Sequence, residues 1–146
     1  MDIVDRRQRS IMMSGIKRTG TKPEMIVRKF LFSNGFRYRI NVKDLPGAPD
    51  MVMKKHHLVI FVHGCFWHHH SGCKFAKMPK TRPEFWVKKL DGNVARDSVV
   101  QQNLLQLGWR IAVVWECALK CSPDDSLREL RGFVLSSRVY AQFSSF

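Results

Sequence analysis

The chain has 146 residues, of which 45% are hydrophobic, so it can bury the core of one folded domain and is not a disordered basic tail. Its 25 Lys and Arg outnumber 12 Asp and Glu, and the resulting formal charge of +13 favours a nucleic-acid partner over an anionic membrane or a ribosomal role. No apolar run approaches the ~20 residues of a membrane span, and charges interrupt the start of the chain where a secretory signal would be apolar, so we expect a cytoplasmic, nucleoid-associated protein.

Residues 1–20 are a basic segment, with Arg9 among its cations and a short apolar stretch that ends at Met13. We interpret this segment as an N-terminal arm that grips a DNA duplex; a solvated terminus is the alternative, and charge alone does not decide between them. Residues 21–146 are expected to form a single domain.

The first half of this domain predicts one helix and three strands. Thr21-Lys22-Pro23-Glu24 is a capping box with Pro in the first turn, which starts a helix that Asn34-Gly35 ends. Apolar and polar residues then alternate, and two apolar runs follow a turn rich in Pro and Gly. The three strands are therefore expected over residues 36–42, 50–53 and 58–62.

The second half predicts three helices and one further strand. A second capping box starts a helix over residues 81–90, and a separate, longer helix is expected over residues 93–107. Residues 109–115 predict a strand, and residues 124–126 begin a last helix. The expected fold is α/β, with a small mixed central sheet of about four strands flanked by helices.

Asp50 is the first candidate for chemistry, because it stands at the head of a predicted strand just after a Pro/Gly turn. A carboxylate held there suits Mg²⁺, although a turn-capping aspartate is the alternative. If the two strands pair as a hairpin, Asp50 lies beside Val62 and His63. The imidazoles of His63 and His68 could then move protons in phosphodiester hydrolysis, with Asp97 orienting one of them.

Closely spaced cysteine and histidine residues indicate a second metal site. Cys65, His70 and Cys73 fall within nine residues, and Cys117 follows a strand that can return to the same end of the sheet. Three thiolates and one imidazole would form a closed, structural Zn²⁺ site. Cys121 could replace Cys117, and buried free thiols are the alternative to a metal.

Phe66 and Trp67 lie among these ligands, where no strand or helix period would bury both. An exposed aromatic pair on a basic protein can wedge into a base step, most easily at a mispair. Core packing is the alternative for each residue. Trp86 and Met13 are weaker candidates for the same role.

Several strings resemble the very-short-patch repair (Vsr) family of DNA mismatch endonucleases, from about Arg9 to Leu119. They are Leu45-Pro46-Gly47-Ala48-Pro49-Asp50, Val62-His63-Gly64-Cys65-Phe66-Trp67-His68-His69-His70, Glu84-Phe85-Trp86, Asn93-Val94-Ala95-Arg96-Asp97, Leu107-Gly108-Trp109-Arg110 and Val114-Trp115-Glu116-Cys117-Ala118-Leu119. The resemblance implies a bacterial enzyme with a restriction-endonuclease-like fold that uses Mg²⁺ to nick one strand 5′ of the thymine in a T:G mismatch. The implied partners are mismatched double-stranded DNA and mismatch-repair proteins, and one nick requires only a monomer.

The resemblance also implies a role for each matched residue. Mg²⁺ would be bound by the Asp50 carboxylate and the Val62 carbonyl. His63 and His68 would be catalytic, with His68 as the water-activating base, Asp97 behind it and Glu24 as an auxiliary residue. Structural Zn²⁺ would be bound by Cys65, His70, Cys73 and Cys117. DNA would be contacted by Phe66, Trp67, Met13, Trp86 and Arg9.

The sequence departs from the family pattern in two places. Val62 replaces a common Thr, which a ligand that binds through its backbone carbonyl tolerates. Ser71-Gly72 adds a residue before Cys73, which leaves His69 as the alternative zinc ligand. The Asp…Glu-x-Lys triad of restriction enzymes is also incomplete, so histidines would supply the proton chemistry.

Two other functions were weighed. A DNA-binding module without catalysis would have no use for Asp50, whose charge repels phosphate unless a cation is present. A restriction nuclease acting on intact duplexes would gain little from an aromatic wedge, because opening a paired step costs more than opening a mispair.

Overall fold

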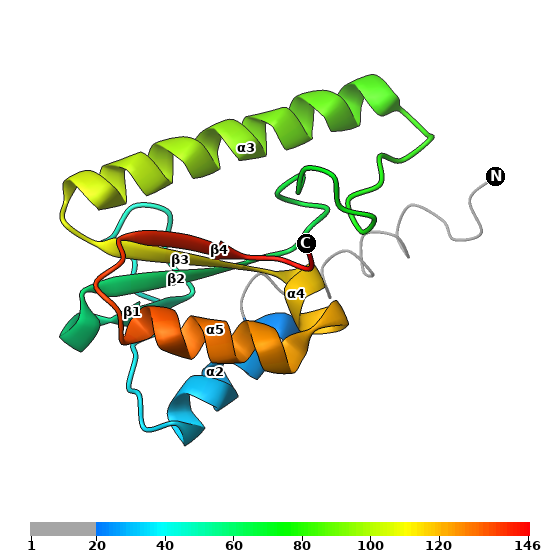
Figure 1. The fold of residues 1–146 in the computed structure, drawn as a ribbon. Helices are drawn as coiled ribbons and strands as arrows, with labels where there is room; N and C mark the ends of the chain where they lie inside the picture. Colours follow the sequence, from blue (N-terminus) through cyan, green and yellow to red (C-terminus); the bar gives the residue numbers. More distant parts are fainter. Residues whose placement is uncertain (1–19) are drawn as a thin grey trace.

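Four strands form a mixed sheet with helices on both faces in the computed structural model, which describes residues 20–146 (Figure 1). The elements in chain order are α2 (Lys22–Ser33), β1 (Met51–Met53), the 3-10 helix η1 (Lys54–His56), β2 (Leu58–His63), α3 (Pro83–Gln106), β3 (Arg110–Trp115), α4 (Glu116–Cys121), α5 (Pro123–Val134) and β4 (Tyr140–Phe143). The strand order is β1-β2-β3-β4, with β1 antiparallel to β2 and the remaining pairs parallel. The predicted α/β class is confirmed; the predicted arm, with Arg9 and Met13, lies outside the described residues.

The two faces of the sheet bury two separate apolar cores. Helices α2 and α5 cover one face, where Leu31 and Phe133 pack in a cluster with Ile60 of β2. Helix α3 crosses the other face, where Leu104 packs in a cluster with Val113 of β3 (Figure 1). Because successive side chains of a strand point to opposite faces, β2 and β3 must be apolar throughout.

Helix α2 begins as the capping box predicts. The Thr21 side chain accepts a hydrogen bond from the Glu24 N–H at 3.4 Å, and Pro23 occupies the first turn. The Glu24 carboxylate accepts a hydrogen bond from the Gly20 N–H, and this places it at the buried start of the helix. The end of the helix is also as predicted, because the Asn34 side chain donates to the Phe30 carbonyl at 2.8 Å.

The prediction of a strand over residues 36–42 is wrong. This segment pairs with β1 only through an isolated bridge between Arg39 and Val52. Asn41 has a φ of 58°, which interrupts the extended backbone, and Ile40 is 40% exposed. The fourth strand is instead β4, which follows α5 and pairs with β3.

The two helices predicted over residues 81–90 and 93–107 are one helix, α3, of 24 residues. Gly92 lies inside it. One glycine costs a helix interior only about 1 kcal/mol relative to alanine, which is too little to end a helix anchored by Leu90 and Leu104 in the core. The short helix α4 was not predicted. Among residues 20–146, no helix is long and apolar enough to cross a membrane.

Candidate active site and metal centre

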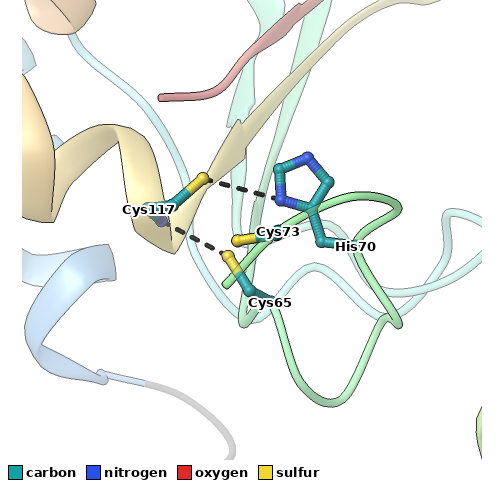
Figure 2. Close-up of side chains that lie close together, drawn as sticks. All are labelled: Cys65, His70, Cys73 and Cys117. Atoms are coloured by element: carbon teal, nitrogen blue, oxygen red, sulfur yellow. Dashed lines mark hydrogen bonds between the residues drawn. The ribbon is translucent and has the colours of Figure 1, made fainter. Parts of the chain in front are cut away.

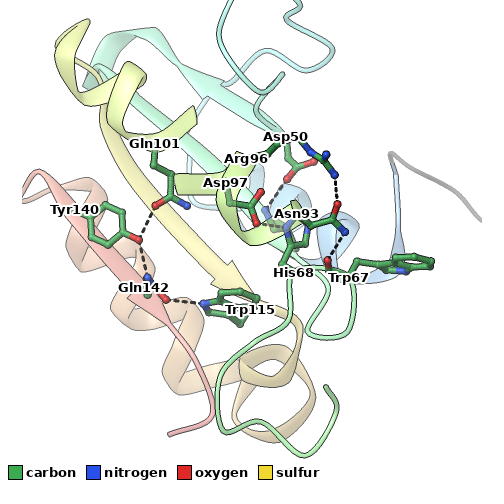
Figure 3. A network of polar contacts seen from close by, with 11 residues as sticks. Asp50, Trp67, His68, Asn93, Arg96, Asp97, Gln101, Trp115, Tyr140 and Gln142 are labelled. Carbon is green, nitrogen blue, oxygen red and sulfur yellow. Dashed lines mark hydrogen bonds and ion pairs between the residues drawn. The ribbon is translucent and has the colours of Figure 1, made fainter. Parts of the chain in front are cut away.

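Asp50 lies just before β1, at the end of the sheet where β2 finishes. Its Oδ2 accepts a hydrogen bond from the Val62 N–H at 2.6 Å, as expected for the predicted hairpin (Figure 3). The N–H and C=O of one residue in a strand point to the same side, so the Val62 carbonyl is directed toward the same edge as the Asp50 carboxylate. The two oxygens that the resemblance implies as Mg²⁺ ligands are therefore directed to the same edge of the sheet.

Glu24 brings a second carboxyl group to this edge. Its side chain is 2% exposed and pairs with Arg28 at 3.1 Å. Burial, then hydrogen bonding to the Glu24 carboxyl, raises the pKa of Asp50 to about 8. Two acidic groups and a backbone carbonyl form an all-oxygen set, and Arg28 compensates part of its negative charge. This donor set fits a hard divalent cation such as Mg²⁺.

His63 and His68 lie beside this edge as a stacked pair. Their ring centroids are 3.7 Å apart and the ring planes differ by 4°. The His68 Nδ1 lies 2.6 Å from the Asp97 Oδ2 of α3 (Figure 3). With the proton on Nδ1, His68 donates to Asp97 and leaves Nε2 free to accept a proton from water.

His63 is the buried member of the pair, at 5% exposure. Burial, then the neighbouring His68, lowers the pKa of His63 to about 3, so its ring is neutral. Its Nδ1 has no hydrogen-bond partner within residues 20–146. The pair therefore presents one neutral, fixed ring and one ring oriented by a carboxylate.

Ligand atoms of His63, His68 and Asp97 lie within 4.8 Å of one another, which is a spacing compatible with a metal ion. The stacking argues against one. An imidazole binds a metal in the plane of its ring, and the two stacked rings direct their nitrogen lone pairs into separate parallel planes. The three residues are better arranged for proton transfer, next to an open cavity of about 450 Å³.

A separate cluster contains Cys65, His70, Cys73 and Cys117 (Figure 2). One ligand atom from each lies within 4.8 Å of the others. The Cys117 Sγ is 3.5 Å from the His70 Nδ1, and the Cys117 N–H donates to the Cys65 Sγ at 3.4 Å. Burial raises the pKa of Cys65, as expected for a thiol in an apolar site. The cluster could hold a metal ion, and three thiols with one imidazole are a donor set that suits Zn²⁺.

The cluster does not include His69 or Cys121, the two alternative residues. His69 lies outside the cluster and faces Asp91, with Nδ1 and Oδ1 3.8 Å apart. Cys121 is exposed on the last turn of α4, whereas Cys117 is buried on its first turn. His70 and Cys117 are therefore the members of the cluster.

The aromatic candidates form a cluster at the start of α3. Phe66 contacts Trp67 and Trp86, with ring centroids 5.1 and 5.4 Å apart, and Trp67 is 36% exposed. Phe85, which was not singled out from the sequence, contacts Trp86 and is 46% exposed. The Asn93 side chain donates to the Trp67 carbonyl at 2.9 Å, so α3 holds this loop as well as His68 (Figure 3).

A polar network that the sequence did not predict lies beside the histidines and includes Trp115. The Trp115 Nε1–H donates to the Gln142 Oε1 at 2.8 Å (Figure 3). Gln142 belongs to β4, which was not predicted, so no sequence signal connected these residues. Alternation along β4, with Ala141 and Phe143 buried and Gln142 exposed, was the only available sign of the strand.

Comparison with known proteins agrees with this arrangement. A family model described as DNA mismatch endonuclease Vsr matches residues 1–74. DNA mismatch endonuclease Vsr of Escherichia coli K12 is 44% identical over 119 residues, which are 82% of this chain and 76% of that protein. Type II nicking enzyme V.XorIIP of Xanthomonas oryzae is 45% identical over 118 residues, which are 81% of this chain and 86% of the relative. V.NmeAIP of Neisseria meningitidis, also a type II nicking enzyme, is 46% identical over 119 residues, 82% of this chain and 84% of the relative. The chain therefore belongs to the Vsr family of DNA mismatch endonucleases, which have a restriction-endonuclease-like fold.

Proposed function

We propose that this endonuclease uses Mg²⁺ to nick one DNA strand 5′ of the thymine in a T:G mismatch, such as arises when 5-methylcytosine is deaminated. One observation carries the proposal: the carboxyl groups of Asp50 and Glu24 meet at the end of β2, and the His68–Asp97 pair lies beside the same strand end. The E. coli relative is named as a mismatch endonuclease and the other two as nicking enzymes, which supports the same reaction.

In this proposal Asp50 and the Val62 carbonyl bind Mg²⁺, with Glu24 as an auxiliary group. The cation would neutralise phosphate charge and polarise the scissile bond. His68 accepts a proton from the attacking water at Nε2, because Asp97 holds Nδ1. His63 packs flat against His68 and keeps the plane of that ring fixed, with a ring nitrogen available to the phosphate.

Recognition of the mismatch is assigned to the aromatic cluster. Phe66 and Trp67 would enter the duplex, supported by Trp86, because unstacking is cheapest at a mispair. Residues 1–20 would act as an arm in the opposite groove, with Met13 intercalating and Arg9 on the backbone. The proposed Zn²⁺ on Cys65, His70, Cys73 and Cys117 would tie down both ends of the segment that carries Phe66, Trp67 and His68. One metal would therefore position the wedge and the base together.

The test uses end-labelled duplexes that differ only in a T:G or T:A pair, incubated with Mg²⁺ or EDTA. We expect a nick on the thymine strand of the T:G duplex, with Mg²⁺ only. Asp50→Asn should abolish the nick and preserve binding measured by fluorescence anisotropy. Asp44→Asn, at an exposed aspartate of the preceding loop, is the matched control and should cut like the wild type. Cleavage in EDTA, or equal cutting of the T:A duplex, would refute the proposal.

The proposed setting follows from the substrate. A single asymmetric nick requires one active site, so a monomer suffices. The enzyme would work on the bacterial nucleoid, and contact with mismatch-repair proteins would link the nick to repair synthesis.

A further inference from the structure

Trp115 separates the Cys/His cluster from the stacked histidines. It is the last residue of β3, pairs in register with His63 of β2, and is 8% exposed. One face of its indole stacks on His70, at 3.9 Å between centroids and 3° between planes. The His63 ring meets it edge-on, at 5.1 Å and 75°. One side chain therefore contacts both a member of the metal cluster and a member of the catalytic pair.

Hydrogen bonds fix the plane of this indole. Gln142 accepts from the Trp115 Nε1–H at 2.8 Å and donates from Nε2 to the Tyr140 hydroxyl at 2.7 Å. That hydroxyl donates to the Gln101 Oε1 of α3 at 2.9 Å. The chain of hydrogen bonds joins β3, β4 and α3 (Figure 3), and Gln101, Trp115 and Gln142 line the same cavity as His63 and His68. A buried indole N–H requires a partner, and here the partner comes from the C-terminal strand.

The segment after β4 completes the cluster from the other side. Phe146 stacks on His70, at 5.1 Å between centroids and 19° between planes. The Ser145 N–H donates to the Cys117 Sγ at 3.4 Å. The His70 ring is thus contacted both by Trp115 of β3 and by Phe146 of the segment after β4.

We propose that Trp115, locked by Gln142, is a positioning residue that couples occupancy of the Cys65/His70/Cys73/Cys117 site to the orientation of His63 and His68. The rings of His70, Trp115 and His63 are packed in contact with one another. A tilt of the His70 ring must therefore displace the indole of Trp115, and the displaced indole must move His63. His68 follows because it stacks on His63 at 3.7 Å. The inference rests on the proposed function, in which His68 accepts a proton from water.

The experiment removes the hydrogen bond between Trp115 and Gln142 in two ways that should be equivalent. Trp115→Phe retains an aromatic ring without its N–H, and Gln142→Leu removes the acceptor. Each should lower kcat on the T:G duplex about fivefold at unchanged KM, the loss expected from about 1 kcal/mol of one hydrogen bond. The double variant should be no slower than the slower single variant, because all three lack the same bond. Gln106→Leu, at an exposed glutamine on the last turn of α3, is the matched control.

Two readouts do not depend on cleavage. In the zinc-loaded protein without DNA, NMR ring signals of His63 and His68 should shift in both variants and stay unchanged in Gln106→Leu. Transfer of zinc to a chromogenic chelator should also be faster in both variants. These two measurements distinguish this inference from the proposed function: if the wild type fails to nick T:G duplexes, the proposed function falls and the coupling is still decided by them. Unshifted histidine signals, additive losses in the double variant, or a rise in KM at unchanged kcat would overturn the coupling.

Discussion

Replacing Asp97 by Asn tests the proton-transfer role of His68 most directly. The substitution keeps the size of the side chain, and the amide oxygen can still accept from the His68 Nδ1–H. What disappears is the negative charge 2.6 Å from that nitrogen. The negative charge of Asp97 matters most when His68 has accepted a proton and become cationic. The substitution should therefore lower the rate of the chemical step and leave DNA affinity unchanged.

The size of the effect follows from the geometry. A hydrogen bond to a charged group contributes about 1.5–3 kcal/mol, and the side chains of His68 and Asp97 are 28% and 26% exposed, which screens the pair toward the lower end. About 1.5–2 kcal/mol corresponds to a loss of roughly 10- to 30-fold in kcat. Folding stability should change far less, because the partly exposed amide remains hydrated.

Single-turnover nicking of a T:G duplex at saturating enzyme measures this step, and anisotropy measures binding. Asp91→Asn is the matched control, since Asp91 lies on the same helix, is 66% exposed and faces His69 at 3.8 Å. We expect wild-type nicking from the control. An Asp97→Asn rate within about twofold of the wild type, or an equal loss in both variants, would refute the assignment of Asp97 as the group that orients His68.

Two further substitutions test the metal cluster and the packing of α3. Cys73→Ser should abolish binding of one zinc per chain, measured by elemental analysis, and lower Tm, whereas Cys121→Ser should change neither; a zinc content unaffected by Cys73→Ser would contradict the cluster. Gly47→Ala should destabilise the fold by about 2 kcal/mol or more in urea unfolding, because φ is +74° and an added Cβ would collide with Val100 of α3. Gly35→Ala shares the positive φ, at +86°, but meets no atom within 4 Å, so it should cost about 1 kcal/mol; equal losses at both sites would exclude the collision.

Local signals in the sequence determined those parts of the protein that depend on short stretches of chain. The capping box at Thr21 predicted α2, and continuous apolar runs predicted β2 and β3, because caps and periodicity act within a few residues. The hairpin of β1 and β2 is also local, so the sequence alone predicts that Asp50 lies beside Val62. The close spacing of thiol and imidazole groups between Cys65 and Cys73 is also a local signal, and it indicated a metal-binding site.

Tertiary structure alone decided what depends on distant parts of the chain. A strand gains its hydrogen-bonding partner only when the sheet assembles. Residues 36–42 therefore form a single bridge to the sheet, whereas Tyr140–Phe143 pair with β3 as strand β4. Gly92 weakens the middle of the helix, and packing of Leu90 and Leu104 in the core keeps α3 continuous through it. Trp115 has no local signature that distinguishes it from any core tryptophan. Its contact with His70 and its hydrogen bond to Gln142 exist because parallel strands bring the ends of β2, β3 and β4 to one edge, where residues remote in sequence share a site.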